Sequence, residues 1–297
     1  MYKNIIFSVF GHDKRQLAIA KALAKMSFSV RLCCVNSFTD NISGCDVFLD
    51  WKQAVLGSDV LILPLPVSRD GTTLSCTDDK IYLEEVIRYA SKYGCRYIVG
   101  GLIPKGMMMK DTENLQIRDY YDSEALQQKN ALPTAEGALM LAMEHTDKII
   151  KGMSVLINGY GRIGSLLADI MYKLGADVTV GSRRDESLCQ ATMAGYKVIR
   201  LTNDSNASAL ANQRFDVIFN TAPAQIFTKK VISSICGNPL YIEIASAPYG
   251  IDLVAARDAG MEVIIAPSIP SKYAPETAGM YILETVFDIL KKGGLSI

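Results

Sequence analysis

Three glycines at a fixed spacing have the most specific chemical meaning in this sequence. They form the pattern Gly-x-Gly-x-x-Gly, which follows the apolar run 155–157 and leads into a helical stretch that reaches about Leu174. In such a strand–turn–helix setting the pattern predicts a dinucleotide site. The first glycine permits a tight turn, the second lets the backbone approach the pyrophosphate, and the third lets helix and strand pack closely. The first N–H groups of the helix would bind the phosphates. We therefore expect cofactor contacts from Gly159, Tyr160, Gly161, Arg162, Ile163 and Gly164.

The residues after the next predicted strand, 178–180, indicate which dinucleotide binds. A site for NAD usually carries Asp or Glu about 20 residues beyond the glycines, bonded to the ribose 2′-hydroxyl. This chain instead has Ser182, Arg183 and Arg184. A hydroxyl and two guanidinium groups suit a 2′-phosphate, because arginine offers a planar donor fork with a permanent charge. The sequence therefore predicts NADP(H). The alternative is that both arginines are ordinary solvated loop charges.

Two later loops complete the predicted cofactor site. One follows the fourth strand of this half and the other follows the fifth strand, where riboses and nicotinamide usually lie in a doubly wound sheet. The residues expected there are Thr221, Ala222, Pro223 and Ser246.

Composition excludes several classes of function. The chain has 297 residues, of which 49% are hydrophobic and 21% are charged, as is typical of a soluble globular protein of two domains. The 31 basic and 31 acidic residues balance, so nucleic acid or an anionic membrane is not expected as a partner. The seven cysteines show no metal-ligand spacing and there are only two histidines, so we expect reduced thiols, no metal and a cytoplasmic protein.

Alternating strand and helix patterns predict an α/β fold with two doubly wound parallel-sheet domains. We expect a substrate and catalytic domain over 1–130 and a Rossmann NADP-binding domain over 131–275. A bridging helix is expected over 134–150, with Thr134 as its N-cap. The last helix begins near Pro275, and residues 276–297 are expected to pack back on the first domain.

A cleft between the two domains is the default place for the substrate. Three loops after strands of the first half offer cationic groups or hydroxyls, and these suit a carboxylate. The residues expected there are His12, Ser68, Arg69, Thr72 and Lys105. His12 or Glu136 is the candidate base, although a turn-stabilising or helix-start role is open for each. No histidine follows residue 145, which disfavours the His–Glu relay of the D-2-hydroxyacid dehydrogenases.

Several segments together resemble one family over nearly the whole chain. They include 11–16, 63–68, 133–137, 145–147, 159–164 and 274–279. The Pro-Thr-x-Glu-Gly and Ala-Pro-x-Thr-Ala-Gly segments are more particular than the glycine loop. In these segments the chain is similar to the A subunit of dipicolinate synthase from endospore-forming bacteria.

The resemblance implies a nicotinamide-dependent oxidoreductase of the sporulating mother cell. It would oxidise dihydrodipicolinate, or a hydroxylated tetrahydro precursor, to pyridine-2,6-dicarboxylate. Its implied partner is the B subunit, which is flavoprotein-like, and we expect a homo-oligomer. Two alternatives stay open: an NADPH-dependent reductase of 2-oxo acids, and a cofactor-binding protein that does no chemistry itself.

Overall fold

The structure is a computed structural model that describes residues 5–11, 13–34, 42–76, 80–108, 114–202 and 206–297. The chain divides into two compact units, one formed by Met1–Asn130 with Ala274–Ile297 and the other by Ala131–Tyr273. The described residues form one six-stranded parallel sheet in each unit, with helices flanking it. This confirms the predicted α/β fold class. Within the described part of the chain, no helix is long and apolar enough to cross a membrane.

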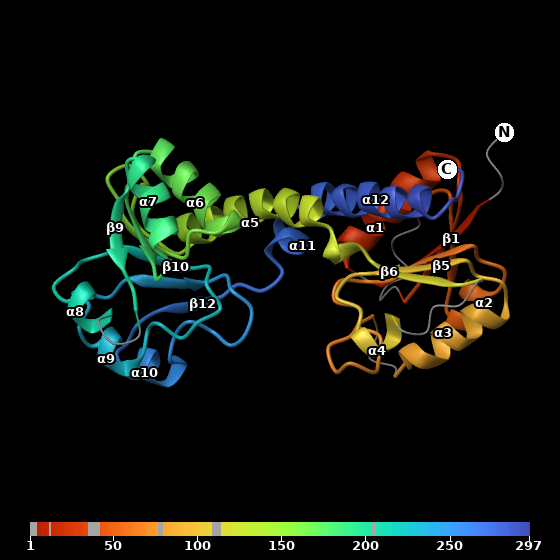
Figure 1. The fold of residues 1–297 in the computed structure, drawn as a ribbon, viewed down its shortest axis with the longest axis horizontal. Coiled ribbons are helices and arrows are strands. Elements are labelled where there is room, and N and C mark those ends of the chain that lie inside the picture. The colour runs from red at the N-terminus through yellow and green to blue at the C-terminus, as the bar shows by residue number, and fades with distance from the viewer. Residues whose placement is uncertain (1–4, 12, 35–41, 77–79, 109–113, 203–205) are drawn as a thin grey trace. The chain divides into compact units, whose positions relative to one another are not determined.

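The first unit is built on a sheet with the strand order β3-β2-β1-β4-β5-β6 (Figure 1). The central strands β1, β4 and β5 are almost completely buried, because helices cover both faces of the sheet. The strand order reverses between β1 and β4, which is where open α/β sheets bind ligands. The strands are β1 (Ile6–Phe10), β2 (Ser29–Cys33), β3 (Cys45–Phe48), β4 (Val60–Ile62), β5 (Tyr97–Gly100) and β6 (Gln116–Asp119).

The helices of this unit lie on the two faces of that sheet, with α1 and α12 on one face and α2 and α3 on the other (Figure 1). The elements are α1 (Lys14–Lys25), α2 (Trp51–Val55), α3 (Leu83–Lys92), α4 (Lys105–Met108), the short 3-10 helix Tyr120–Asp122 and α12 (Pro275–Lys292). The C-terminal helix α12 packs on α1 so closely that a Cβ at Gly279 would lie 2.7 Å from the carbonyl oxygen of Arg15. The expected return of the last helix to the first domain is thus confirmed.

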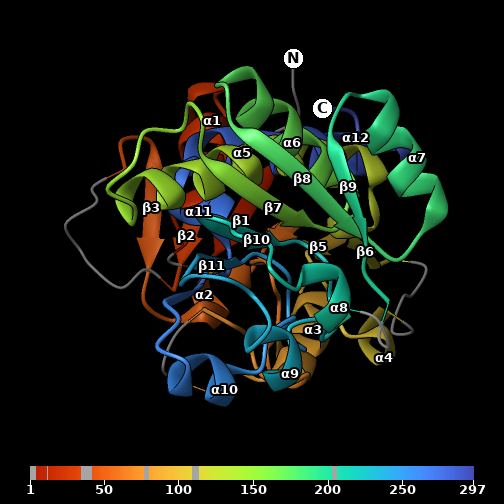
Figure 2. The same cartoon turned by 90° about the vertical axis from the view of Figure 1, so that its left-hand side faces the viewer.

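The second unit repeats the same strand order with different elements. Its sheet runs β12-β11-β10-β7-β8-β9, and the order reverses between β7 and β10. Figure 2 labels β11, β10, β7, β8 and β9 of this sheet. The strands are β7 (Ser154–Asn158), β8 (Asp177–Ser182), β9 (Lys197–Arg200), β10 (Val217–Asn220), β11 (Leu240–Glu243) and β12 (Val263–Ile265). The helices are α6 (Arg162–Lys173), α7 (Asp185–Met193), α8 (Asn206–Leu210), α9 (Lys229–Ile232), α10 (Leu253–Asp258) and α11 (Ile269–Tyr273).

The helix expected over 134–150 is longer at its start and shorter at its end. Helix α5 spans Glu124–Glu144 and contains Pro133 within it. Thr134 is therefore an interior residue and does not cap the helix. Proline removes one helical hydrogen bond and usually ends a helix. The apolar contacts of the following turns, where Ala135 and Ala138 are fully buried, compensate for that loss.

Asp13 is expected to contribute strongly to the stability of the first unit. Its carboxylate accepts a hydrogen bond from the backbone N–H of Arg15 and caps α1. It also binds the Arg15 guanidinium through two bonds of 3.0 and 2.7 Å, and that guanidinium is nearly buried. Among the described residues, Asp13→Ala would leave the buried guanidinium of Arg15 with the carbonyl oxygen of Leu65 as its remaining hydrogen-bond acceptor. We expect it to lower the free energy of unfolding by about 3 kcal/mol, measured by urea denaturation.

Asp50→Ala is the matched control, because Asp50 caps α2 through a single exposed bond to the N–H of Lys52. Its expected cost is about 1 kcal/mol. Equal losses for the two variants would contradict a special role for the buried ion pair.

Candidate dinucleotide site

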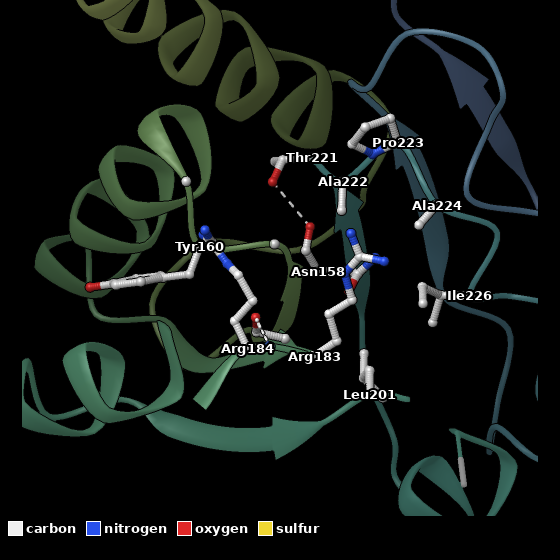
Figure 3. A pocket seen from close by; sticks show the side chains of 13 residues that line it. Asn158, Tyr160, Arg183, Arg184, Leu201, Thr221, Ala222, Pro223, Ala224 and Ile226 are labelled. Carbon is white, nitrogen blue, oxygen red and sulfur yellow. Dashed lines mark hydrogen bonds between the residues drawn. The ribbon is translucent and has the colours of Figure 1, made fainter. Parts of the chain in front are cut away.

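A cavity of about 280 Å³ lies at the carboxyl ends of β7, β8 and β10, beside the point where the strand order of the second unit reverses (Figure 3). This is the position at which open α/β sheets bind nucleotides. The residues that line it are Asn158, Gly159, Tyr160, Gly161, Ser182, Arg183, Arg184, Leu201, Thr221, Ala222, Pro223, Ala224 and Ile226. The structure thus brings together segments from the ends of four strands, β7, β8, β9 and β10.

The geometry of the three glycines fits a bound pyrophosphate. Gly159 has φ +99°, and a Cβ there would clash with the hydroxyl of Thr221. A Cβ at Gly164 would clash with the carbonyl oxygen of Gly159, so helix α6 and the loop touch at this point. A Cβ at Gly161 would meet no atom within 4 Å. The open space above Gly161 is where a phosphate group can approach the backbone and the first turn of α6.

Two arginines form one side of the cavity. Arg183 and Arg184 follow β8, are exposed, and extend their side chains toward the cavity (Figure 3). Ser182 is buried, and its hydroxyl accepts a hydrogen bond of 3.1 Å from the backbone N–H of Arg184, which shapes this turn. Among the lining residues that the structure describes there is no carboxylate. Asp185 follows directly but forms an ion pair with Arg200. The charge on this side of the cavity therefore favours an anionic group.

The opposite side of the cavity is formed by the loop after β10. The hydroxyl of Thr221 donates to the carbonyl oxygen of Asn158 at 3.1 Å, as the dashed line in Figure 3 shows. This bond ties the loop to the end of β7. Ala222 and Pro223 continue the wall.

Nine of the thirteen residues expected to contact the cofactor line this cavity. The other four do not: Arg162, Ile163 and Gly164 lie in the first turn of α6, and Ser246 is exposed beyond β11. The residues that the sequence reasoning missed are Asn158, Leu201, Ala224 and Ile226. Asn158 was detectable, because it is a polar residue that ends an apolar strand directly before the glycines.

A buried polar network lies behind the cavity. Asn158, Asn220 and Glu243 are the last residues of β7, β10 and β11, and they are partners in the register of neighbouring strands. Their exposed fractions are 3%, 0% and 1%. Burial raises the pKa of the Glu243 carboxyl, and the hydrogen bonds that it accepts, led by the bond from Asn220, oppose this shift.

The candidate substrate residues of the first unit lie on loops that contact one another. The N–H of Val67 donates to the carbonyl oxygen of Gly101, and the Arg15 guanidinium donates to the carbonyl oxygen of Leu65. The start of α1 and the loops after β4 and β5 are therefore neighbours at the strand-order reversal of this sheet. His12 lies outside the described residues.

Ser68 and Thr72 do not have the free hydroxyls that the sequence analysis expected. Both donate to the Oδ1 atom of Asp70, at 3.0 and 3.1 Å. Thr73 donates to the same carboxylate through its N–H and its hydroxyl, and these bonds lower the pKa of Asp70 below its usual value. Asp70 thus stays ionised and organises the loop internally, which disfavours Ser68 and Thr72 as ligands of a substrate carboxylate.

Arg69, Lys105 and Glu136 are exposed. Lys105 is the first residue of α4, and Arg69 lies in the loop that Asp70 organises. Glu136 lies within α5 in the second unit, and not at a helix start as expected.

Two family models match the chain, one in each unit. The model described as the N-terminal domain of the A subunit of dipicolinate synthase matches residues 6–121. The model of the NAD-binding domain of S-adenosyl-L-homocysteine hydrolase matches residues 134–273. The second unit is therefore an NAD-binding Rossmann-like domain.

Relatives of the whole chain are also found. The A subunit of dipicolinate synthase from Bacillus subtilis (strain 168) is 27% identical over 98% of this chain and 97% of its own length. The crystal structure of the same protein from Bacillus halodurans has a TM-score of 0.81 and 27% identity, covering 98% of this chain and 99% of that one. The corresponding structure from Bacillus subtilis has a TM-score of 0.79 and 25% identity, covering 98% and 97%. A transhydrogenase structure from Sinorhizobium meliloti (TM-score 0.68, 13% identity, covering 97% and 94%) shows the shared fold.

Proposed function

Because the chain carries an NAD-binding domain and is a homologue of the A subunit of dipicolinate synthase, we propose that it is an NADP(H)-dependent oxidoreductase of dipicolinate synthesis. The observation that carries the choice of NADP(H) is the cavity with Arg183 and Arg184 on one side and no carboxylate among its described lining residues. The proposed reaction is the oxidation of dihydrodipicolinate to dipicolinate in the mother cell of a sporulating bacterium. Its hydroxylated tetrahydro precursor would give the same product by losing one water in addition to the two hydrogens.

Different residues of the chain would bind the cofactor, remove a proton and bind the substrate. The backbone around Gly161 and the first turn of α6 would hold the pyrophosphate, and Arg183 and Arg184 would bind the 2′-phosphate. The bound nicotinamide would supply the acceptor for the hydride that leaves the ring, while one proton goes to a base. His12 and Glu136 remain the proposed bases. Arg69 and Lys105 would bind the two ring carboxylates.

A coupled absorbance assay tests this function. Purified chain, NADP+ and freshly made dihydrodipicolinate are mixed, and formation of NADPH is followed with and without the proposed flavoprotein-like partner. We expect NADPH to form in proportion to dipicolinate. Turnover of a panel of 2-oxo acids with NADPH, and no reaction of dihydrodipicolinate, would contradict the proposal. The absence of any reaction until the partner is added, with no NADPH formed, would support a non-catalytic cofactor-binding role instead.

Arg69→Ala tests the proposed substrate contact. Arg69 is exposed beside the Asp70-centred turn, so its removal leaves the bonds within that turn in place. We expect the KM for the dicarboxylate to rise about tenfold, since one charge-assisted contact is lost, while the KM for NADP+ stays the same. Arg88→Ala, which removes another arginine of the same unit from helix α3, serves as the control. Unchanged substrate kinetics in Arg69→Ala would reject this contact.

A further inference from the structure

In the buried network of Asn158, Asn220 and Glu243, the carboxylate determines which side-chain atoms donate and which accept hydrogen bonds. Glu243 accepts hydrogen bonds at both carboxylate oxygens. Oε1 accepts from the side chain of Asn220 at 2.6 Å and from the N–H of Ala245 at 3.2 Å. Oε2 accepts from the N–H of Gly250 at 2.8 Å and from the hydroxyl of Tyr241 at 3.3 Å. Each oxygen also accepts from a backbone N–H, so both act as acceptors here, and Asn220 turns its amide nitrogen toward Oε1 of Glu243.

The orientation of Asn220 fixes that of Asn158. With its nitrogen bonded to Glu243 and to the carbonyl oxygen of Ala222 (3.0 Å), Asn220 presents Oδ1 in the opposite direction. That oxygen accepts from the amide nitrogen of Asn158 at 2.6 Å and lies 3.4 Å from the N–H of Ala222. Gly250 packs directly against this amide, since a Cβ at Gly250 would clash with it.

The hydrogen bonds that link Glu243, Asn220 and Asn158 form a relay, and its last member, Asn158, reaches the cavity. Asn158 lines it, and its amide nitrogen is directed toward Asn220. Its Oδ1 has no bonding partner among the residues that the structure describes. The bond to Asn220 therefore fixes Asn158 Oδ1 as a hydrogen-bond acceptor at the end of β7. This oxygen lies next to the loop of Thr221 and Ala222.

We infer that Glu243 is a positioning residue: it orients Asn220 and Asn158 so that Asn158 Oδ1 accepts a hydrogen bond from the nicotinamide half of the bound dinucleotide. An oxygen acceptor repels a phosphate and suits a donor, so its partner is a ribose hydroxyl or the carboxamide N–H. Ala222, held by Asn220 through both its N–H and its carbonyl oxygen, belongs to the same positioned wall. This inference rests on the proposed function, because it requires that the cavity bind NADP(H).

Glu243→Gln is the primary test, since it keeps the shape and replaces one acceptor by a donor. The new glutamine must either face the N–H of Gly250 with its own NH₂ or reverse the relay through Asn220 and Asn158. Either way a buried donor loses its acceptor. We expect the Kd for NADPH to rise about tenfold, while the Kd for adenosine 2′,5′-bisphosphate, which lacks the nicotinamide half, changes less than about twofold.

A double variant provides a rescue that a merely structural role would not give. Asn220→Asp alone places two carboxylates side by side and should weaken NADPH binding at least as much. In Glu243→Gln with Asn220→Asp, the glutamine NH₂ donates to the aspartate, which again accepts from Asn158. The new aspartate no longer donates to the carbonyl oxygen of Ala222. We therefore expect the double variant to bind NADPH more tightly than Asn220→Asp alone, but less tightly than the wild type. Tyr241→Phe is the matched control, because it removes only the 3.3 Å bond on the far oxygen, and its affinities should be unchanged.

The binding measurements distinguish a failure of the proposed function from a failure of the positioning role of Glu243. A wild-type chain that binds neither NADPH nor the bisphosphate overturns the proposed function. A wild-type chain that binds both, with Glu243→Gln affecting both equally or neither, overturns the positioning role and leaves the proposed function standing. Asn158→Ala covers the case in which Glu243→Gln does not fold. It removes only the cavity end of the relay, and an unchanged NADPH affinity in that variant also overturns the inference.

Discussion

Replacing Arg183 and Arg184 together with alanine is expected to weaken NADPH binding about 100-fold, while NADH binding changes less than about threefold. The reason is that the two guanidinium groups are the cations on the β8 side of the cavity, and only NADPH carries a 2′-phosphate for them to bind. A hydrogen bond to a charged group contributes about 1.5–3 kcal/mol, so two such contacts account for a change of this size. Fluorescence titration of both cofactors measures it.

Arg257→Ala is the control for a general loss of positive charge. Arg257 lies on α10 of the same unit, its side chain is 79% exposed, and it does not line the cavity. Its removal should leave both affinities unchanged. A similar loss of NADH and NADPH affinity in the double-arginine variant would mean that the arginines bind the pyrophosphate and do not select the cofactor.

Gly161→Ala is expected to weaken both dinucleotides by about 10- to 100-fold with little change in melting temperature. The backbone at Gly161 has φ −96° and ψ −160°, which alanine can adopt, and the new Cβ meets no protein atom within 4 Å. Alanine is a poorer N-cap than glycine, but it also restricts the unfolded chain, so these two small effects on stability oppose each other. The methyl group instead enters the space needed by the pyrophosphate, and overpacking of this kind costs about 1–3 kcal/mol.

Gly164→Ala should behave in the opposite way. Its Cβ would clash with the carbonyl oxygen of Gly159, so we expect a clear drop in melting temperature of the chain without cofactor. Thermal melts and titrations of the two variants side by side check both statements. An intact dinucleotide affinity in Gly161→Ala would show that the phosphates do not approach this part of the loop.

The continuous apolar strands were predictable from the sequence because helices cover both faces of each sheet. The predicted strands over 155–157 and 178–180 lie within β7 and β8, whose residues are buried apart from the first of each strand, since buried parallel strands form uninterrupted apolar runs. The edge strands β3 and β6 could not be predicted in this way. β3 is largely exposed, and β6 has a single buried residue, Ile117, so neither edge strand shows such a run. The helix expected from residue 134 begins at Glu124 instead, because tertiary packing carries α5 through Pro133.

The parts of the dinucleotide site whose backbone is fixed by a motif were predictable from the sequence. The parts that depend on hydrogen bonds between side chains were less predictable. The glycine loop and the arginines after β8 come together because successive strand ends of one sheet meet at one edge. The relay through Asn220 and Glu243 could not be predicted, because it depends on the register of β7, β10 and β11. The engagement of Ser68 and Thr72 by Asp70 depends on a turn conformation that the sequence alone did not reveal.

The proposed function requires that the cavity beside Arg183 and Arg184 bind NADP(H). The most direct test is equilibrium titration of the purified chain with NADPH and with NADH under the same ionic strength. We predict that NADPH binds at least about tenfold more tightly, and that the difference shrinks as salt is added, because a 2′-phosphate bound by exposed arginines is screened. Equal affinity for the two cofactors at low salt would contradict the claim.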